Sequence, residues 1–355
     1  MDILFICKKR NEYENEYGEY GQQKQTKPSK PHLTFGLHNS AQFVVNYLTA
    51  RNYNTEVVTA IDGNDIDRLV TSTNPKIVII EALWATPDKF RELLKLKRHQ
   101  SRTWIVRLHS RIGFIANEGI AFPWLAEYAK IPGLIVAPNT EEFATDLARI
   151  FNMPTIYLPN IYYTDQVEVL PKTPKKITRA TIDIGCFGAV RPMKNHLNQA
   201  VAAVKFAENN GLMLNFHINS SRVEQSGGNV LKNLQAFFGA LSDHKLVEHG
   251  WLSHNDFCEL VRTMDMGMQV SFTETYNIVA ADFVSNNIPI VGSPQITWLP
   301  QMFQSDPNST DNITETLDRA WWGSVVGLHK FSKYCLMKNI AEAEHIWLEY
   351  MKKTI

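Results

Sequence analysis

The feature that most constrains the fold is an alternation of short apolar runs with amphipathic segments, which occurs twice along the chain. The apolar runs are rich in Val, Ile and Phe and too short for helices, which indicates strands buried on both faces. The segments between them have an apolar residue every three or four positions, as helices do. Strands joined through helices form right-handed crossovers and are parallel. The sequence therefore predicts an α/β protein with two tandem Rossmann-like, doubly wound domains.

The two halves are separated by a stretch at 162–180 that contains prolines and lysines but no apolar period, as linkers do. In the first half the predicted strands are 2–7, 55–59, 76–80, 103–108, 133–137 and 155–158, and the predicted helices are 40–51, 87–98 and 141–151. In the second half the predicted strands are 182–187, 212–218, 265–270 and 288–291, and the predicted helices are 195–209, 229–241 and 253–264. A helical period returns at 341–351.

We place an N-terminal domain at 1–165, a linker at 166–180, a second domain at 181–335 and a terminal helix at 336–355. The 355 residues are enough for two separate cores. In doubly wound folds the ligand lies beyond the carboxyl ends of the strands. One segment departs from this pattern: residues 8–37 lack an apolar period and follow the first strand. We expect a mobile surface loop there, or a lid that binds an acceptor.

Composition excludes several classes of protein. Lys+Arg and Asp+Glu both number 36, so no global field attracts the chain to nucleic acid or membrane. The four cysteines are far apart in sequence, which is typical of reduced thiols in a cytoplasmic protein. The first apolar run is too short for a signal peptide, and none approaches the roughly 18–20 residues that span a bilayer. Neither a P-loop nor a G-x-G-x-x-G, H-E-x-x-H or paired C-x-x-C motif is present.

Two loops carry the residues that indicate a chemistry. Arg191 and Lys194 follow the strand 182–187 and precede a helix, which suits a diphosphate approaching past Gly188. Glu274 opens a predicted helix, and Asp282 lies two turns later, about 12 Å away at 1.5 Å per residue. Cations for a diphosphate and carboxylates for hydroxyl groups suit a nucleotide sugar. Taken in isolation, the same residues also fit a solvated turn, a helix cap and a surface Asp.

The order of these motifs resembles the donor domain of GT-B glycosyltransferases, especially the retaining, glycogen-synthase-like group called family 4. That family has G-x-(x)-R-x-x-K-(G/N), and later E-(G/S)-(F/Y)-G-(L/I)-x-x-x-E before a G-x-P-V-V strand. This chain has GAVRPMKN at 188–195, ETYNIVAAD at 274–282 and NNIPIV at 286–291. LIVAPNT at 134–140 and LPNI at 158–161 resemble the family's earlier turns. The resemblance covers most of 130–300 in the correct order.

The resemblance implies a role for each matching residue. Arg191 and Lys194 would stabilise the leaving nucleoside diphosphate in place of a divalent metal, and Glu274 would bind hydroxyls of the donor sugar. Asp282 would bind the ribose, although it is shorter than the family's Glu. The remaining implied donor-binding residues are Gly188, Tyr276, Asn277, Ile278 and Val279, and Asn277 replaces a glycine. The implied reaction is metal-independent transfer with retention, without a cofactor and with a UDP-sugar as the expected donor.

His109 ends the strand 103–108, where family members often have a histidine near the donor sugar and acceptor. A structural role is the alternative for a lone histidine. In this fold the last helix commonly crosses back to the first domain. The Asp65-Ile-Asp67 sequence has the spacing of a metal-binding D-x-D motif, but we read it as a helix start.

The acceptor is less defined. Residues 89–111 contain eight Lys or Arg and one acid, Glu92, and Arg107 and Arg111 bracket His109. Such a patch can contact an anionic acceptor, and double-stranded DNA with a hydroxymethylated base is one. A glycan, a lipid and a small molecule are alternatives. A non-catalytic GT-B-like binding protein and a sugar-nucleotide epimerase are the other functions that this pattern allows.

Overall fold

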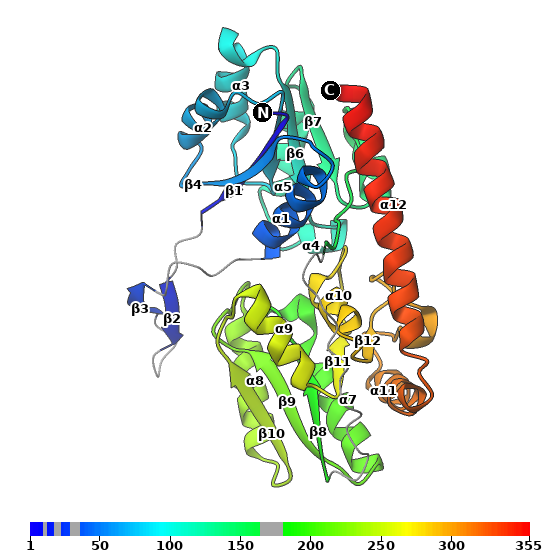
Figure 1. Ribbon diagram of the computed structural model, residues 1–355. Helices are drawn as coiled ribbons and strands as arrows, with labels where there is room; N and C mark the ends of the chain where they lie inside the picture. The colour runs from blue at the N-terminus through cyan, green and yellow to red at the C-terminus, as the bar shows by residue number, and fades with distance from the viewer. Residues whose placement is uncertain (10–12, 18–22, 29–35, 164–179) are drawn as a thin grey trace. The chain divides into compact units, whose positions relative to one another are not determined.

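The computed structural model describes residues 1–9, 13–17, 23–28, 36–163 and 180–355 (Figure 1). The chain divides into two units, each built on its own sheet. Unit 1 comprises Met1–Asn11, Phe35–Thr164 and Asn339–Ile355, and unit 2 comprises Glu12–Thr34 and Asp165–Lys338. Nearly all of the predicted linker lies outside the described residues.

Unit 1 contains a five-stranded parallel sheet in the order β4-β1-β5-β6-β7. Its strands are β1 (Ile3–Lys8), β4 (Thr55–Ala60), β5 (Ile77–Glu81), β6 (Thr103–Leu108) and β7 (Leu134–Pro138). Its helices are α1 (Gly36–Thr49), α2 (Asp65–Thr73), α3 (Pro87–Lys95), α4 (Ile112–Ile115), α5 (Ala121–Tyr128) and α6 (Glu141–Phe151), with a short 3₁₀ turn, η1 (Lys97–His99). Every residue of β5 is buried, as expected for a central strand covered on both faces.

One predicted strand of unit 1 is shorter than expected, and the segment 8–37, which was predicted to be a loop, contains a short ribbon. Residues 155–158 run beside β7, but they form only one bridge, between Thr155 and Val136. Prolines at 154 and 159 flank this stretch and have no N–H to donate, which limits the ladder. In the segment 8–37, β2 (Tyr13–Tyr17) and β3 (Gln23–Pro28) pair as an antiparallel ribbon where we expected no regular structure. The rest of that segment beyond Lys9 and before Gly36 lies outside the described residues.

The C-terminal part of α12 (Lys330–Thr354) completes the core of unit 1. Trp347 is fully buried and packs against Phe5, with ring centroids 6.0 Å apart. Its Nε1–H donates a hydrogen bond of 2.8 Å to the carbonyl of Pro159, and Met351 is buried in the same cluster. The helix thus supplies core residues to the sheet face on which Ile3 and Phe5 of β1 lie.

Unit 2 contains a second five-stranded parallel sheet, in the order β10-β9-β8-β11-β12. Its strands are β8 (Thr181–Gly185), β9 (Met213–Asn219), β10 (His244–His249), β11 (Met266–Gln269) and β12 (Ile290–Gly292). Its helices are α7 (His196–Asn209), α8 (Gly227–Gly239), α9 (His254–Thr263), α10 (Ile278–Ser285) and α11 (Thr310–Val325), with 3₁₀ turns η2 (Pro192–Lys194) and η3 (Gln301–Phe303). The prediction of two parallel α/β sheets is confirmed.

Tight packing positions α10 at the centre of this second sheet. Gly185 of β8 and Gly267 of β11 are paired across the ladder. A Cβ at either position would lie within 3 Å of the Phe283 ring, at 2.9 Å from Gly185 and 2.6 Å from Gly267. The two glycines therefore allow α10 to lie close to the sheet, and the N-terminus of this helix follows the carboxyl end of β11.

Candidate functional site

The two loops singled out in the sequence follow β8 and β11, which are neighbours in the sheet, and backbone contacts join them. The amide of Phe272 donates to the carbonyl of Met193 at 3.0 Å. The side chain of Asn195 donates to the carbonyl of Val270 at 3.0 Å, and the amide of Val270 donates to Gln199 at 2.8 Å. These bonds fix one loop against the other before any ligand is considered.

Lys194 and Glu274 meet across this junction. The Lys194 Nζ and the Glu274 Oε1 form an ion pair, and the two side chains are 12% and 9% exposed. Gly188 lies beside the lysine with φ of +117°, a conformation that only glycine adopts without strain. Residues 80 positions apart in sequence thus form one charged contact in a largely desolvated place.

Arg191 is also paired, but with a different acid. Its Nη1 lies 3.3 Å from Glu224 Oε2, and Glu224 in turn accepts from Arg222. Next to these cations, His196 is buried at the first position of α7, and among the described residues neither of its ring nitrogens has a hydrogen-bond partner. Burial, then the charges of Lys194 and Arg191, lower the pKa of His196 to about 3, so the imidazole is neutral.

The start of α10 differs from the prediction. Glu274 does not open the helix but lies in the loop, because Asn277 is the N-cap, with φ of 60°. Its side chain accepts from the amide of Ala280 at 2.9 Å and donates to Gln269 Oε1 at 2.9 Å. Asparagine tolerates this left-handed conformation better than other non-glycine residues, so the substitution for glycine keeps the turn. Ile278 and Val279 form the first turn of α10.

Tyr276 anchors this loop and is not displayed to solvent. Its ring is 7% exposed and lies 6.0 Å from the ring of Trp298, whose Nε1–H donates to the Tyr276 carbonyl at 2.8 Å. Burial raises the pKa of its hydroxyl well above the usual value, as does the charge of Asp282. In this structure Tyr276 supports the loop, and its implied role in donor binding stays a prediction.

Asp282 is placed differently from the prediction as well. Its side chain is 2% exposed and accepts from Nε2 of His254 on α9 at 2.7 Å. The aspartate is one methylene shorter than the expected glutamate, so its carboxylate stays near the helix, where His254 reaches it. Burial alone would lower the pKa of His254, but the hydrogen bond to Asp282 and the negative charge raise it to about 10. Asp282 is thus engaged by His254 in this structure, and its binding of a ribose stays a prediction.

Cys258 completes a group of three side chains with metal-ligating atoms. Its Sγ lies 3.8 Å from His254 Nε2 and 4.0 Å from Asp282 Oδ1. His, Cys and Asp are zinc ligands, but two ligands at bond lengths near 2.0 Å in a tetrahedral site lie roughly 3.3 Å apart. The 2.7 Å between His254 and Asp282 is shorter than that. The group is arranged as a hydrogen-bonded ion pair beside a thiol, which gives no support for a preformed metal centre.

This pair makes a testable contribution to stability. We expect His254→Gln to destabilise unit 2 by about 2–4 kcal/mol at pH 7, because it leaves a buried carboxylate without a counter-charge. Since folding raises the pKa of His254 from about 6.5 to about 10, its contribution is complete below pH 6.5 and is lost as the pH rises through 10. Thermal unfolding of both proteins between pH 6 and 10.5 measures this. The exposed His345→Gln is the matched control, and a constant gap at all pH values contradicts the ion pair.

Arg107 of unit 1 occupies a buried polar cluster. Its guanidinium is fully buried and donates to Glu81 at 3.1 Å and to the carbonyls of Leu158 and Pro159. It also donates to the side-chain oxygen of Asn160 at 2.7 Å. The prediction that Arg107 meets an acceptor is wrong, because its hydrogen-bonding groups serve to join β5, β6 and the chain after β7.

Five of the eight basic residues in the stretch 89–111 pair with acids, and most of these acids lie outside the stretch. Arg111 pairs with Glu142 at 3.7 Å, and Arg98 makes two hydrogen bonds to Asp67. Lys89 pairs with Glu92, and Arg91 pairs with Asp88 and Glu127. A count along the sequence therefore overstated the charge of the folded surface. Asp65 and Asp67 begin α2, as expected, and Asp67 is an ion-pair partner.

His109 lies next to Glu81 at the carboxyl end of β6, and its Nε2 contacts the Glu81 carboxylate. Burial lowers the pKa of His109, the Arg107 charge lowers it further, and Glu81 opposes both. The carboxyl of Glu81 stays ionised, because Arg107 and His109 offset the effect of its burial on the pKa. The neutral histidine therefore donates through Nε2 and carries its lone pair on Nδ1.

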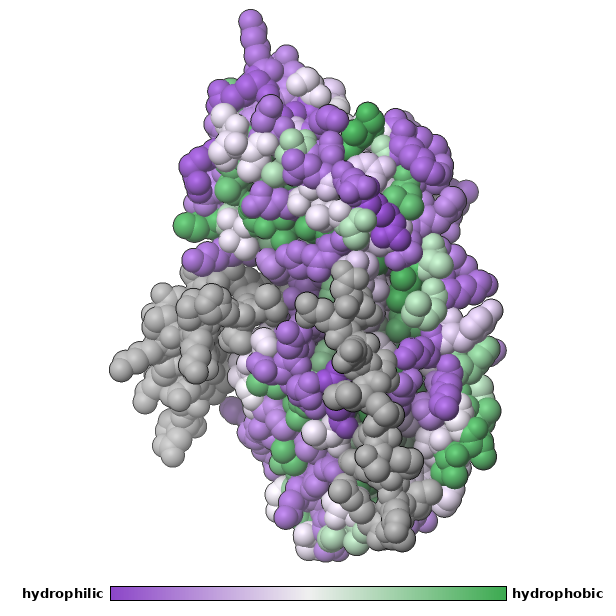
Figure 2. Space-filling model, viewed as in Figure 1, coloured by the Kyte–Doolittle hydropathy of each residue, from purple (hydrophilic) through white to green (hydrophobic). Residues whose placement is uncertain are grey.

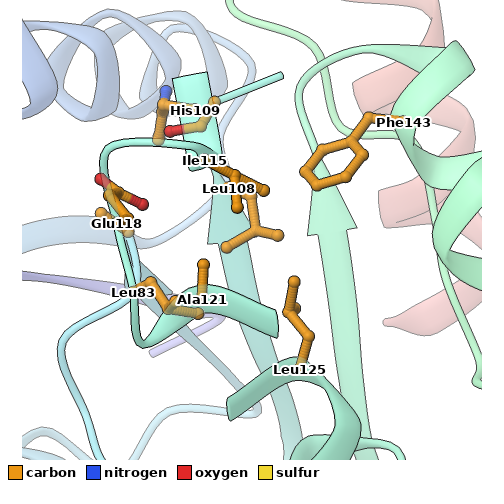
Figure 3. Close-up of a pocket in the computed structure, with 10 residues that line it drawn as sticks. Leu83, Leu108, His109, Ile115, Glu118, Ala121, Leu125 and Phe143 are labelled. Carbon is orange, nitrogen blue, oxygen red and sulfur yellow. The ribbon is translucent and has the colours of Figure 1, made fainter. Parts of the chain in front are cut away.

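A small pocket, partly open to solvent, adjoins His109. Figure 3 shows His109 and Glu118 on one side and Phe143 across from them, with aliphatic side chains between. Ala82 also lines the pocket and has φ of 68°, a strained conformation for alanine. Such strain is often found at functional sites. Sequence reasoning found His109 but not this pocket, because its walls come from four separate segments.

Solved structures with similar folds are known, although no protein-family model and no curated protein matches the chain. A UDP-forming trehalose-phosphate synthase from Burkholderia xenovorans is 12% identical, with a TM-score of 0.65 over 100% of this chain and 98% of that one. The trehalose-6-phosphate protein of E. coli, bound with UDP-2-fluoro glucose, is 11% identical, with a TM-score of 0.66 over 99% of each chain. Sucrose-phosphate synthase from Thermosynechococcus elongatus is 12% identical, with a TM-score of 0.64 over 99% and 98%.

The chain has the GT-B fold. In GT-B proteins, as in other doubly wound sheets, ligands are expected at the carboxyl ends of the strands, and Lys194, Glu274 and His109 lie at such ends. Sequence reasoning missed His196, Glu224 and His254. His196 had a usable signal, since it directly follows Lys194 and Asn195 at a helix start. None of the helices in the described ranges has the length and apolar character needed to cross a bilayer.

Proposed function

We propose that this chain is a retaining glycosyltransferase that moves a sugar from a nucleotide-sugar donor, bound in unit 2, to an acceptor hydroxyl. The observation that carries the proposal is the desolvated Lys194–Glu274 pair at the carboxyl ends of β8 and β11, with the start of α10 directly after it. The likeness to a protein named as a UDP-forming synthase and to one bound with UDP-2-fluoro glucose supports the same function.

Each residue has a part in this proposal. Lys194 and Arg191 bind the diphosphate and stabilise the charge that develops as it leaves. Glu274 accepts hydrogen bonds from hydroxyls of the sugar, and its ion pair with Lys194 supports a sugar site next to the proposed diphosphate site. The amides of Ile278 and Val279, at the N-terminus of α10, add partial positive charge. As the diphosphate leaves, the sugar has oxocarbenium character. The acceptor hydroxyl attacks the sugar on the face from which the diphosphate departs.

The donor is proposed to be a UDP-sugar, bound without a metal. Two lysine or arginine side chains and a helix N-terminus provide the positive charge that a divalent ion provides in other transferases. Neutral His196, buried behind the cations, adds hydrogen-bonding capacity without adding charge.

The acceptor is proposed to be a hydroxyl of a glycan, a lipid or a small molecule. Duplex DNA was the first expectation from residues 89–111, but the ion pairs of that stretch remove the observation that favoured it. The pocket beside His109 is lined mainly by aliphatic and aromatic side chains, which suits an uncharged part of an acceptor better than a phosphate backbone.

Thermal-shift screening of nucleotide sugars tests the donor, followed by measurement of UDP release with and without EDTA. We expect a UDP-sugar to raise the melting temperature and slow donor hydrolysis to release UDP, with no effect of EDTA. Donor binding without release indicates a binding protein, and isomerised donor indicates an epimerase. If no nucleotide sugar changes the melting temperature, the donor site is wrong.

A further inference from the structure

The exposed large hydrophobic residues of unit 2 are concentrated in one place. Of the fifteen such residues in the described part of the chain, seven lie in 322–337, and each is between 43% and 75% exposed. They are Trp322, Val325, Val326, Leu328, Phe331, Tyr334 and Met337, and we refer to them as the α11–α12 patch. Figure 2 shows a hydrophobic area at the lower right, where Figure 1 draws α11 and the beginning of α12.

The local structure holds these side chains outward. The turn between the helices is closed by a hydrogen bond of 2.9 Å from Leu328 N to the Gly323 carbonyl, and Gly327 has φ of 81°. Phe331 and Tyr334 lie one turn apart on α12 and stack at 6.1 Å with an interplanar angle of 13°. The opposite sides of these helices, including Gly323 and Leu336, are buried. The patch is therefore a fixed helical corner with its aromatic rings facing solvent.

Positively charged residues flank the patch in the sequence. From 319 to 341 the sequence contains four cations and no acid, and the nearest acids are Asp318 and Glu342. The cations are Arg319, Lys330, Lys333 and Lys338. Glu315, an acid two turns before Trp322 on α11, is also exposed. The chain as a whole has no net charge, so this is a local departure from balance.

We propose that the α11–α12 patch docks on the surface of an anionic lipid membrane. Helices that lie in a membrane interface combine Trp, Phe and Leu on one face with Lys and Arg beside them, as this corner does. Trp and Tyr rings are favoured at the headgroup level, and lysines are attracted to anionic lipid. This inference goes beyond the proposed sugar transfer and does not depend on it.

Composition and symmetry disfavour a second copy as the occupant. Protein interfaces are depleted in lysine, whereas three lysines border this patch. In a two-fold dimer the same surface of both chains would meet, so the four cations of one copy would face those of the other. A lipid surface of opposite charge has neither disadvantage.

Co-sedimentation of the full chain with vesicles tests the proposal. We expect binding to phosphatidylcholine vesicles containing about a quarter phosphatidylglycerol, at least tenfold weaker binding to phosphatidylcholine alone, and weakening in 0.5 M salt. The double variant Phe331→Ser, Tyr334→Ser should lose at least tenfold in binding. Because both residues are exposed, its melting temperature should be unchanged.

The matched control is Ile61→Ser, which removes a side chain that is 66% exposed in unit 1 and should leave binding unchanged. Charge reversal by Lys330→Glu with Lys338→Glu should abolish the preference for anionic vesicles. Absence of vesicle binding, or equal binding by the aromatic variant, overturns the proposal. So does light scattering that shows a dimer which Phe331→Ser converts to a monomer, since a second copy then covers the patch.

Discussion

Replacing Lys194 with alanine is expected to lower sugar transfer by about 10²–10³-fold. Its ammonium group is the cation paired with Glu274 in the desolvated site, and removal of one such group from a developing anion typically has this effect. The rate of UDP release at saturating donor measures the loss. Glu274→Gln should also impair transfer, because its neutral amide holds the sugar hydroxyls less strongly.

Lys205→Ala is the matched control for this variant. Lys205 lies on α7 in the same unit and pairs with Asp311, but it is 40% exposed and lies outside the two loops. Its removal should change the rate less than twofold. The catalytic assignment fails if Lys194→Ala retains full activity, or if its loss of activity follows only from unfolding at the assay temperature.

Replacing Arg107 with methionine is expected to destabilise unit 1 by about 3–5 kcal/mol. The substitution keeps an apolar side chain of similar length but leaves the Glu81 carboxylate buried without its cation. It also removes the donors to the carbonyls of Leu158 and Pro159 and to the side chain of Asn160. The Pro159 carbonyl also accepts a hydrogen bond from Trp347 of the C-terminal helix, so the lost contacts adjoin that helix. Urea or thermal unfolding monitored by tryptophan fluorescence measures the change.

Arg98→Met is the control for Arg107→Met. Arg98 also pairs with a carboxylate, Asp67, but it is 49% exposed, so its loss should lower stability by less than about 1 kcal/mol. The double variant Glu81→Gln, Arg107→Met should be more stable than Arg107→Met alone, because no buried charge is left unpaired. Similar losses of stability for Arg98→Met and Arg107→Met would show that burial does not increase the contribution of an ion pair to the free energy of unfolding.

Much of the fold was predictable because its strands are buried on both faces. Strands such as β1 and β5 begin in the sequence as uninterrupted apolar runs, and a parallel order follows from the helices between them. Of the two five-stranded sheets, the strand that was missed is β10, which contains His, Lys and Glu and is half exposed, because it lies at the edge of its sheet. Apolar periodicity alone therefore does not detect an edge strand of this kind.

The candidate site was predictable only in part. Loop motifs located Arg191, Lys194 and Glu274, since the residue types and their position after strands carry the signal. The partners of the charged groups were not predictable, because Glu224, His254 and Glu81 lie 33, 28 and 26 positions from Arg191, Asp282 and Arg107. These partners decide which charged side chains are available to a ligand and which are engaged within the fold. They explain why Arg107 and Asp282 were given ligand-binding roles that their burial does not support.

The path of the chain through the two units has a consequence for synthesis. The core of unit 1 contains both Phe5 and Trp347. This core is therefore complete only after the C-terminal helix has been synthesised, which follows the synthesis of the whole of unit 2. Proteins usually complete their N-terminal domain first on the ribosome. Here the order of completion is reversed, and a premature stop between Lys338 and Trp347 would leave unit 2 whole while leaving an apolar face of β1 uncovered.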